Sequence, residues 1–164
     1  MNNIQKFDEL VAVLLAHLYE NFPRRTEIDA FEFLDIEFEH RSFLDDSEGF
    51  EEHTNKCLEA DFFLDTVLWL IDSGFLYGKI QNEVAGFYTS KKCIDITLSP
   101  KGLELLKLVP SSLDVSQSLG EKLVDTINKG AKDAGSKLVS EALTKFASVN
   151  QIISLLSNVG VNSL

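Results

Sequence analysis

The sequence predicts a mainly α-helical fold with a small β-hairpin and a C-terminal amphipathic helical extension, and three observations predict it. Apolar residues recur at intervals of three and four in several long segments, as on the buried face of a helix. Residues 93–98 instead alternate apolar and polar side chains, with the period of a half-buried strand. The chain has 164 residues and is 45% hydrophobic. A chain of this size buries on the order of 70% of its unfolded surface and needs no disulfide or metal to fold.

The first expected helix runs from Ile4 to Phe22, where apolar side chains fall at helical spacing. Pro23 ends it, because proline cannot donate the next backbone hydrogen bond. Thr26 is a residue type suited to an N-cap and is followed by acids, which predicts a second helix from Thr26 to about Leu34. Residues 35–52 are acidic and irregular and predict a loop with a short helical piece.

The third expected helix runs from Thr54 to Ser73, and Gly74 is suited to end it in the left-handed conformation. Apolar side chains cover most of its circumference, which is typical of a helix at the centre of a domain. The remaining stripe is acidic, and its members share one face because they are spaced by four, three and four residues. The stripe consists of Asp61, Asp65, Leu68 and Asp72.

Two strands, residues 75–80 and 93–98, are expected to form a long hairpin around a polar connection of 12 residues. Within this connection Val84, Phe87 and Tyr88 either extend the first strand or add a third one.

A fourth helix should follow the hairpin, with Ser99 as its N-cap and Pro100 in the first helical position, and Pro110 ends it. These elements predict one domain over residues 1–110, followed by a linker over 111–118.

Residues 119–164 are expected to form the helical extension. Ser118 and Glu121 match a capping box that opens a long helix from Leu119 to about Ser148. Residues 130–135 are rich in small side chains, which permits either a close helix contact or a break, since glycine weakens a helix. Residues 152–156 predict a short terminal helix. The apolar stripe would hold two copies together or pack on its own domain, and its dimerisation candidates are Leu119, Leu123, Ile127, Leu138 and Phe146.

The acidic residues are concentrated in one part of the chain. The formal net charge is −11, from 26 acids and 15 bases. Residues 26–75 carry net −13 and the other residues together carry net +2. Such asymmetry indicates a polarised surface that would bind a basic protein partner, or else a solvated face that keeps the protein in solution. The candidate partner-binding acids are Asp45, Asp46, Glu48, Glu51, Glu52, Asp61, Asp65 and Asp72.

The order helix, helix, loop, helix, strand, connection, strand, helix resembles a winged helix-turn-helix domain over about residues 3–110. Residues 66–76 carry this resemblance, because the third helix leaves through a glycine into an apolar strand. Residues 94–106 carry it too, because the hairpin leaves through Ser-Pro-Lys-Gly into a helix. The resemblance implies that the third helix enters the DNA major groove and that residues 79–92 form a wing on the backbone or minor groove.

The acidic stripe of the third helix departs from the DNA-binding pattern. Two like charges a few ångström apart cost on the order of 1 kcal/mol even in water. Carboxylates facing phosphates also release no counterions to offset that cost. DNA binding through this helix is therefore disfavoured, and a dimeric DNA-binding regulator would have to use other bases. The candidates for such contacts are Arg24, Arg25, Lys79, Lys91 and Lys92.

The sequence predicts no catalytic residues, no cofactor and no metal. His53 and Cys57 stand four residues apart, but a structural zinc site needs four ligands, so His40 or Cys93 would have to complete it. His17 lies among apolar residues and is expected to be half-buried.

Two cysteines do not make a disulfide framework. The N-terminus lacks the pattern of a secretory signal, and no apolar run is long enough for a bilayer span. We therefore expect a cytoplasmic protein that does not associate with membranes.

Three functions remain open at this point. The preferred one is a non-catalytic regulatory or protein-interaction module that binds a basic partner through the acidic surface. The second is the dimeric DNA-binding transcription regulator that contacts DNA through the wing. The third, by analogy with small acidic proteins, is an inhibitor of the immunity or antitoxin kind.

Overall fold

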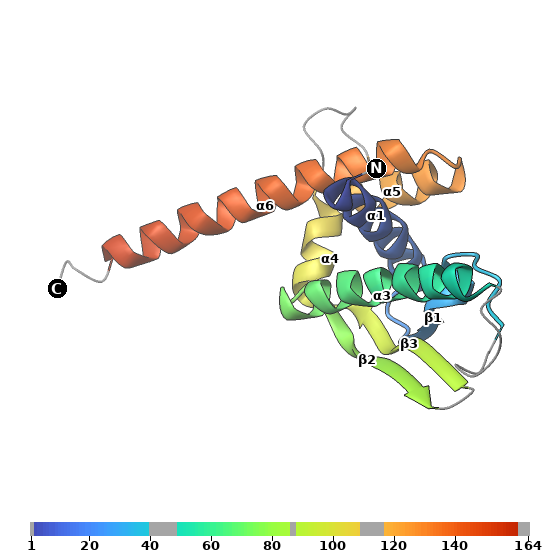
Figure 1. Ribbon diagram of the computed structural model, residues 1–164. Helices are drawn as coiled ribbons and strands as arrows, with labels where there is room; N and C mark the ends of the chain where they lie inside the picture. The colour runs from blue at the N-terminus through green and yellow to red at the C-terminus, as the bar shows by residue number, and fades with distance from the viewer. Residues whose placement is uncertain (1, 40–48, 86–87, 109–116, 161–164) are drawn as a thin grey trace. The chain divides into compact units, whose positions relative to one another are not determined.

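The computed structural model describes residues 2–39, 49–85, 88–108 and 117–160, and the side chains as far as residue 148. These residues form a mixed α/β structure with six helices and a three-stranded antiparallel sheet (Figure 1). The chain divides into two compact units, one of residues 17–103 and one of residues 1–16 together with 104–164. Within the described part of the chain, no helix has the length and apolar character needed to cross a membrane.

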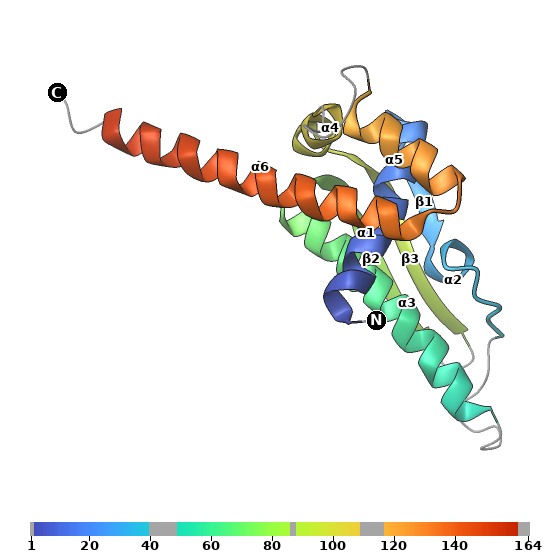
Figure 2. The same ribbon diagram turned by 90° about the horizontal axis from the view of Figure 1, so that it is seen from above.

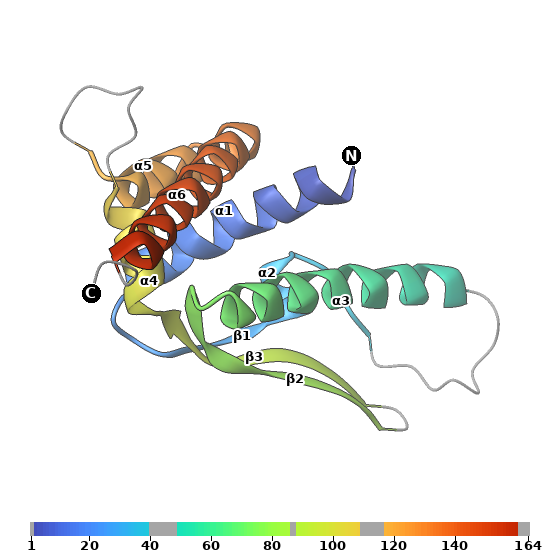
Figure 3. The same cartoon turned by 90° about the vertical axis from the view of Figure 1, so that its left-hand side faces the viewer.

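The unit of residues 17–103 contains the sheet and the long helix α3, Phe50–Asp72. Its sheet has the order β1-β3-β2, formed by β1 (Thr26–Asp29), β2 (Leu76–Ala85) and β3 (Tyr88–Leu98). The short helix α2, Ala30–Phe33, follows β1 directly. Figure 3 shows α3 running along one face of the sheet, against β2 and β3. Its inner side is buried through Ala60, Phe63, Leu64, Val67 and Leu70.

The expected helix start at Thr26 is wrong. Thr26–Asp29 is a strand that pairs with β3, with Thr26 opposite Ile96 and Ile28 opposite Cys93. The N-cap is Asp29, whose Oδ1 accepts hydrogen bonds from the backbone N–H groups of Phe31 at 3.0 Å and Glu32 at 3.3 Å. Pairing with a strand about 70 residues away therefore overrides the local preference for a helix.

The third helix begins four residues earlier than expected, at Phe50, and ends at Asp72 as expected to within one residue. Gly74 has φ +79°, which confirms the left-handed exit that the sequence predicts.

The hairpin is longer than expected, because both strands continue through the connection until Ala85 pairs with Tyr88. The alternative in which Val84 extends the first strand is therefore confirmed, while Phe87 lies outside the described residues.

The other unit contains the first part of α1 (Asn3–Asn21), the end of α4 (Pro100–Lys107), α5 (Leu119–Asn128) and α6 (Lys132–Gly160). Figure 2 shows α5 beside the first half of α6. Gly135 allows this contact, since a Cβ there would lie 2.9 Å from Ile127 Cδ1 and 3.3 Å from Ala12 Cβ. The buried core of this unit includes Val11, Leu15, Leu105, Leu106, Leu119, Leu123 and Val139.

Two helix starts agree with the sequence. The Ser99 Oγ accepts a hydrogen bond from the Gly102 N–H at 3.0 Å, and Ser118 and Glu121 form the capping box. The single helix expected over 119–148 is instead broken at Gly130, which has φ +75°. The second piece, α6, continues to Gly160 and includes the residues expected to form a separate terminal helix. Pro110 and most of the expected linker lie outside the described residues, and the domain boundaries stay a prediction.

Candidate functional site

One side of α3 carries large apolar side chains that are exposed to water. Leu58, Asp65, Trp69 and Asp72 are spaced by seven, four and three residues and so lie on this side. Leu58 is 60% exposed and Trp69 is 46% exposed, and Leu68 at the edge of the same side is 43% exposed. We call the exposed residues Glu51, Leu58, Glu59, Asp65, Leu68, Trp69 and Asp72 the outer face of α3.

The carboxylates of the outer face have no partner within the described residues. Glu51, Glu59, Asp65 and Asp72 are exposed, and none forms an ion pair or accepts a hydrogen bond from another described side chain. Their neighbour Glu52 differs, because its carboxylate is 2.8 Å from the Lys56 ammonium. The outer face therefore combines exposed leucine and tryptophan with carboxylates that have no partner among the described side chains.

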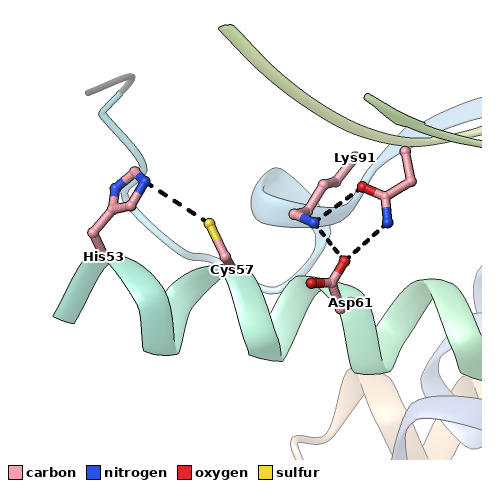
Figure 4. Close-up of polar contacts among 5 residues, drawn as sticks. His53, Cys57, Asp61 and Lys91 are labelled. Atoms are coloured by element: carbon pink, nitrogen blue, oxygen red, sulfur yellow. Dashed lines mark hydrogen bonds and ion pairs between the residues drawn. The ribbon is translucent and has the colours of Figure 1, made fainter. Parts of the chain in front are cut away.

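Asp61 belongs to the same predicted stripe but has a different environment. Figure 4 shows its carboxylate directed at the Lys91 ammonium of β3. Lys91 donates to Asp61 Oδ1 and, at 3.1 Å, to Asn82 Oδ1, while the Asn82 amide donates to Asp61 Oδ1 at 3.1 Å. This cluster joins α3 to both strands of the hairpin. Since Lys91 is only 3% exposed, its charge must be paired to be tolerated.

The prediction that Lys91 is a surface contact of the wing is therefore wrong, because its ammonium lies beneath α3. Lys92 is more exposed, but its ammonium is 2.7 Å from a Glu27 carboxylate oxygen, and the hydrogen bond to that carboxylate raises the pKa of Lys92. Lys79, Arg24 and Arg25 are exposed, and Arg25 donates to the Asp95 backbone carbonyl at 3.2 Å.

His53 and Cys57 contact each other at the sheet side of α3, with 3.9 Å between the Sγ and Nε2 atoms (Figure 4). Burial raises the pKa of the Cys57 thiol, an effect that nearby Lys91 partly opposes. Cys93 is fully buried in the sheet, and burial raises its pKa to about 12. Neither thiol is therefore activated as a nucleophile or as a metal ligand at neutral pH.

No group of three or more metal-binding side chains occurs among the described residues, and His40 lies outside them. The expected partial burial of His17 is confirmed, and its ring meets Phe33 edge-on at 5.8 Å. A polar hollow of about 230 Å³ near the start of α3 adds further acids to this unit. It is lined by Glu37, Glu39, Gly49, Glu52, His53 and Lys56.

The remaining predicted positions divide into three groups. Asp45, Asp46 and Glu48 lie outside the described residues. Leu119 and Leu123 are buried within their own unit by α5 packing on α6, so they are not available to a second copy and that part of the dimer prediction is wrong. The other dimerisation candidates are half-buried, and the dimer stays a prediction for Ile127, Leu138 and Phe146.

Sequence reasoning missed the apolar half of the outer face. The apolar residues that cover most of this helix, and predict a central position for it, include Leu58 and Trp69, but both are exposed. The sequence did contain a signal, because the third helix has more apolar residues than one buried stripe requires. A helix that packs on one sheet buries a single stripe, so the additional apolar residues have to lie on another face.

Comparisons of the chain with protein-family models, with curated proteins and with solved structures give no match. A fold alone does not determine a function. The chemistry of the outer face is therefore the feature of the molecule that bears on its function.

Proposed function

We propose that the protein is a non-catalytic protein-interaction module on a winged-helix core, and that its acidic surface binds a basic protein. One observation carries the proposal: the outer face of α3 exposes four carboxylates that have no ion-pair partner among the described residues. Such a face attracts a positively charged partner and accelerates their association.

The order of elements supports the winged-helix assignment. α1, α2 and α3 precede the hairpin β2–β3, and α4 follows it with Ser99 and Pro100 at its start. In this assignment α3 corresponds to the recognition helix, and residues 79–92 correspond to the wing.

The distribution of bases favours a protein partner over DNA. DNA affinity depends on Lys and Arg side chains that neutralise phosphates. Two of the wing lysines lie in β3, where Lys91 is buried and Lys92 is paired with Glu27. The helix that would enter the groove presents Asp65 and Asp72 instead of bases.

A titration tests this proposal. Trp69 is the only tryptophan, so its fluorescence reports directly on the outer face. We expect a lysine-rich synthetic peptide to bind at low salt. The double variant Asp65→Asn/Asp72→Asn should bind it about tenfold more weakly, since two exposed ion pairs together contribute roughly 1.4 kcal/mol.

The matched control is Glu104→Gln/Glu141→Gln, which removes the same charge from exposed positions of the other unit. It should retain nearly all of the affinity. Equal weakening by both double variants would overturn the proposal. So would tighter binding of duplex DNA than of the peptide at low salt, if Arg24→Glu and Lys79→Glu abolish that binding.

A further inference from the structure

Resting on that proposed function, we infer that the outer face of α3 binds a basic amphipathic α-helix. That helix places apolar anchors on Leu58 at one end and on Trp69 with Leu68 at the other, and its Lys or Arg side chains meet Asp65 and Asp72. The proposed function requires only a basic partner, whereas this inference also specifies that the ligand is a helix and how long it is.

The apolar anchor at the Trp69 end is held in place. Its indole stacks on the Phe75 ring, with 6.5 Å between ring centroids and 21° between planes. The Lys101 ammonium lies 4.4 Å from the centroid of the same Phe75 ring and donates to the Ser73 carbonyl at 2.6 Å. A tryptophan that is fixed before binding loses little side-chain freedom on binding, which is typical of residues that dominate interface energies.

The ligand has to be a helix rather than an extended segment. α3 is continuous over 23 residues, and its backbone groups are paired within the helix, so it offers no strand edge to an extended peptide. A second helix laid along α3 presents side chains at the same three- and four-residue intervals. Since Leu58 and Trp69 are eleven residues apart, the anchors are separated by three turns, or about 16 Å. The ligand helix therefore spans at least three turns.

The charge of the outer face selects a basic ligand. Asp65 lies between the two apolar anchors and Asp72 lies one turn beyond Trp69. A ligand helix without cations at these positions would remove water from the carboxylates, and no new ion pair would compensate for that desolvation cost. A second copy of α3 is excluded as the occupant because it would bring the same four acids against these.

The experiment uses the full chain and three 18-residue synthetic peptides. The first has leucine at positions i, i+4, i+7 and i+11 and lysine at most others. The second has the same composition in an order that scatters the leucines around the helix. The third replaces every lysine of the first with glutamate. Trp69 emission is recorded as each peptide is added.

We expect the first peptide to bind and to shift Trp69 emission to the blue as the indole loses water. The second should bind at least about tenfold more weakly, and the third should not bind. Leu58→Ala should weaken the first peptide about tenfold, because it removes one of the two apolar anchors against which the ligand helix packs. The control Val84→Ala truncates an apolar residue of β2 that is 53% exposed, against 60% for Leu58, and should leave the affinity unchanged.

The peptide results distinguish a failure of the helix inference from a failure of the proposed function. Equal binding of the first and second peptides, or equal effects of Leu58→Ala and Val84→Ala, would overturn the helix inference and leave the proposed function standing. Failure of both basic peptides to bind would overturn both. A blue shift that grows with protein concentration in the absence of peptide would identify another copy of the chain as the occupant and would also overturn the inference.

Discussion

Acids on one face of α3 have opposite roles. Asp61 accepts hydrogen bonds from Lys91 and Asn82 and joins the helix to the hairpin. Asp65 and Asp72 lie about one and three turns further along and have no ion-pair partner among the described residues. An acidic stripe in a sequence is therefore not one functional unit. One of its members stabilises the fold, and the others remain available to a ligand.

The largest expected effect is on the buried member of the cluster. Lys91→Ala should lower the free energy of unfolding by about 2 kcal/mol, because it removes a buried ion pair and the packing of the lysine stem. This figure is below that of a fully buried pair, since the Asp61 side chain is 37% exposed. Urea denaturation measures the change.

Lys92→Ala is the matched control for this variant. Lys92 is the next residue in the chain and also contacts a carboxylate, but the Glu27 carboxylate is exposed to solvent. Its loss should change the unfolding midpoint very little, because exposed ion pairs contribute little. Equal destabilisation by the two variants would contradict the distinction between the buried ion pair of Asp61 and an exposed ion pair.

Substitutions of Asp61 and Asp65 should have smaller and unequal effects on stability. Asp61→Asn should lower the free energy of unfolding by about 1–2 kcal/mol, because the buried Lys91 ammonium keeps only neutral acceptors. Asp65→Asn should leave the stability unchanged or raise it slightly, because it removes repulsion from neighbouring acids. Thermal unfolding of both variants at one pH tests this, and a larger loss for Asp65→Asn would contradict the account.

The two cysteines differ in burial, and their reactivity should differ accordingly. Cys57 is half-buried on the Asp61 side of α3, and Cys93 is buried beneath the helix in β3. Because burial raises both pKa values, that of Cys93 to about 12, both thiols are protonated at pH 8. We expect iodoacetamide to modify Cys57 more slowly than a free cysteine, and Cys93 only after unfolding.

The modification rate at Cys57 should rise about tenfold per pH unit from pH 7 to 8, as the thiolate fraction grows. Mass spectrometry of the labelled peptides measures both rates, with Cys57→Ser as the control. Rapid labelling of Cys93 in the folded protein would contradict its placement beneath α3.

Local signals in the sequence were sufficient for several elements. The start of α4 at Ser99 and Pro100, the Ser118–Glu121 capping box and the exit of α3 at Gly74 depend on residues only a few positions apart. Such signals are readable because the groups that satisfy each other are neighbours in the chain.

Features that depend on distant partners were not predictable. β1 is a strand because Thr26 meets Ile96, and Lys91 is buried because Asp61, thirty residues earlier, provides its counter-charge. For the candidate site, spacing alone placed Asp65 and Asp72 on one face of a helix. Spacing did not show that Asp61 forms an ion pair with Lys91, or that Leu58 and Trp69 are exposed on the outer face.

Binding at the outer face of α3 is tested by recording backbone amide chemical shifts while the amphipathic basic peptide is added to the full chain. We expect the largest shifts on residues 58–72 of α3, with Leu58, Asp65 and Trp69 among them, and we expect them to shrink in Asp65→Asn/Asp72→Asn. Shifts that instead concentrate in residues 1–16 and 104–148, or that are unchanged in the double variant, would contradict binding at this face.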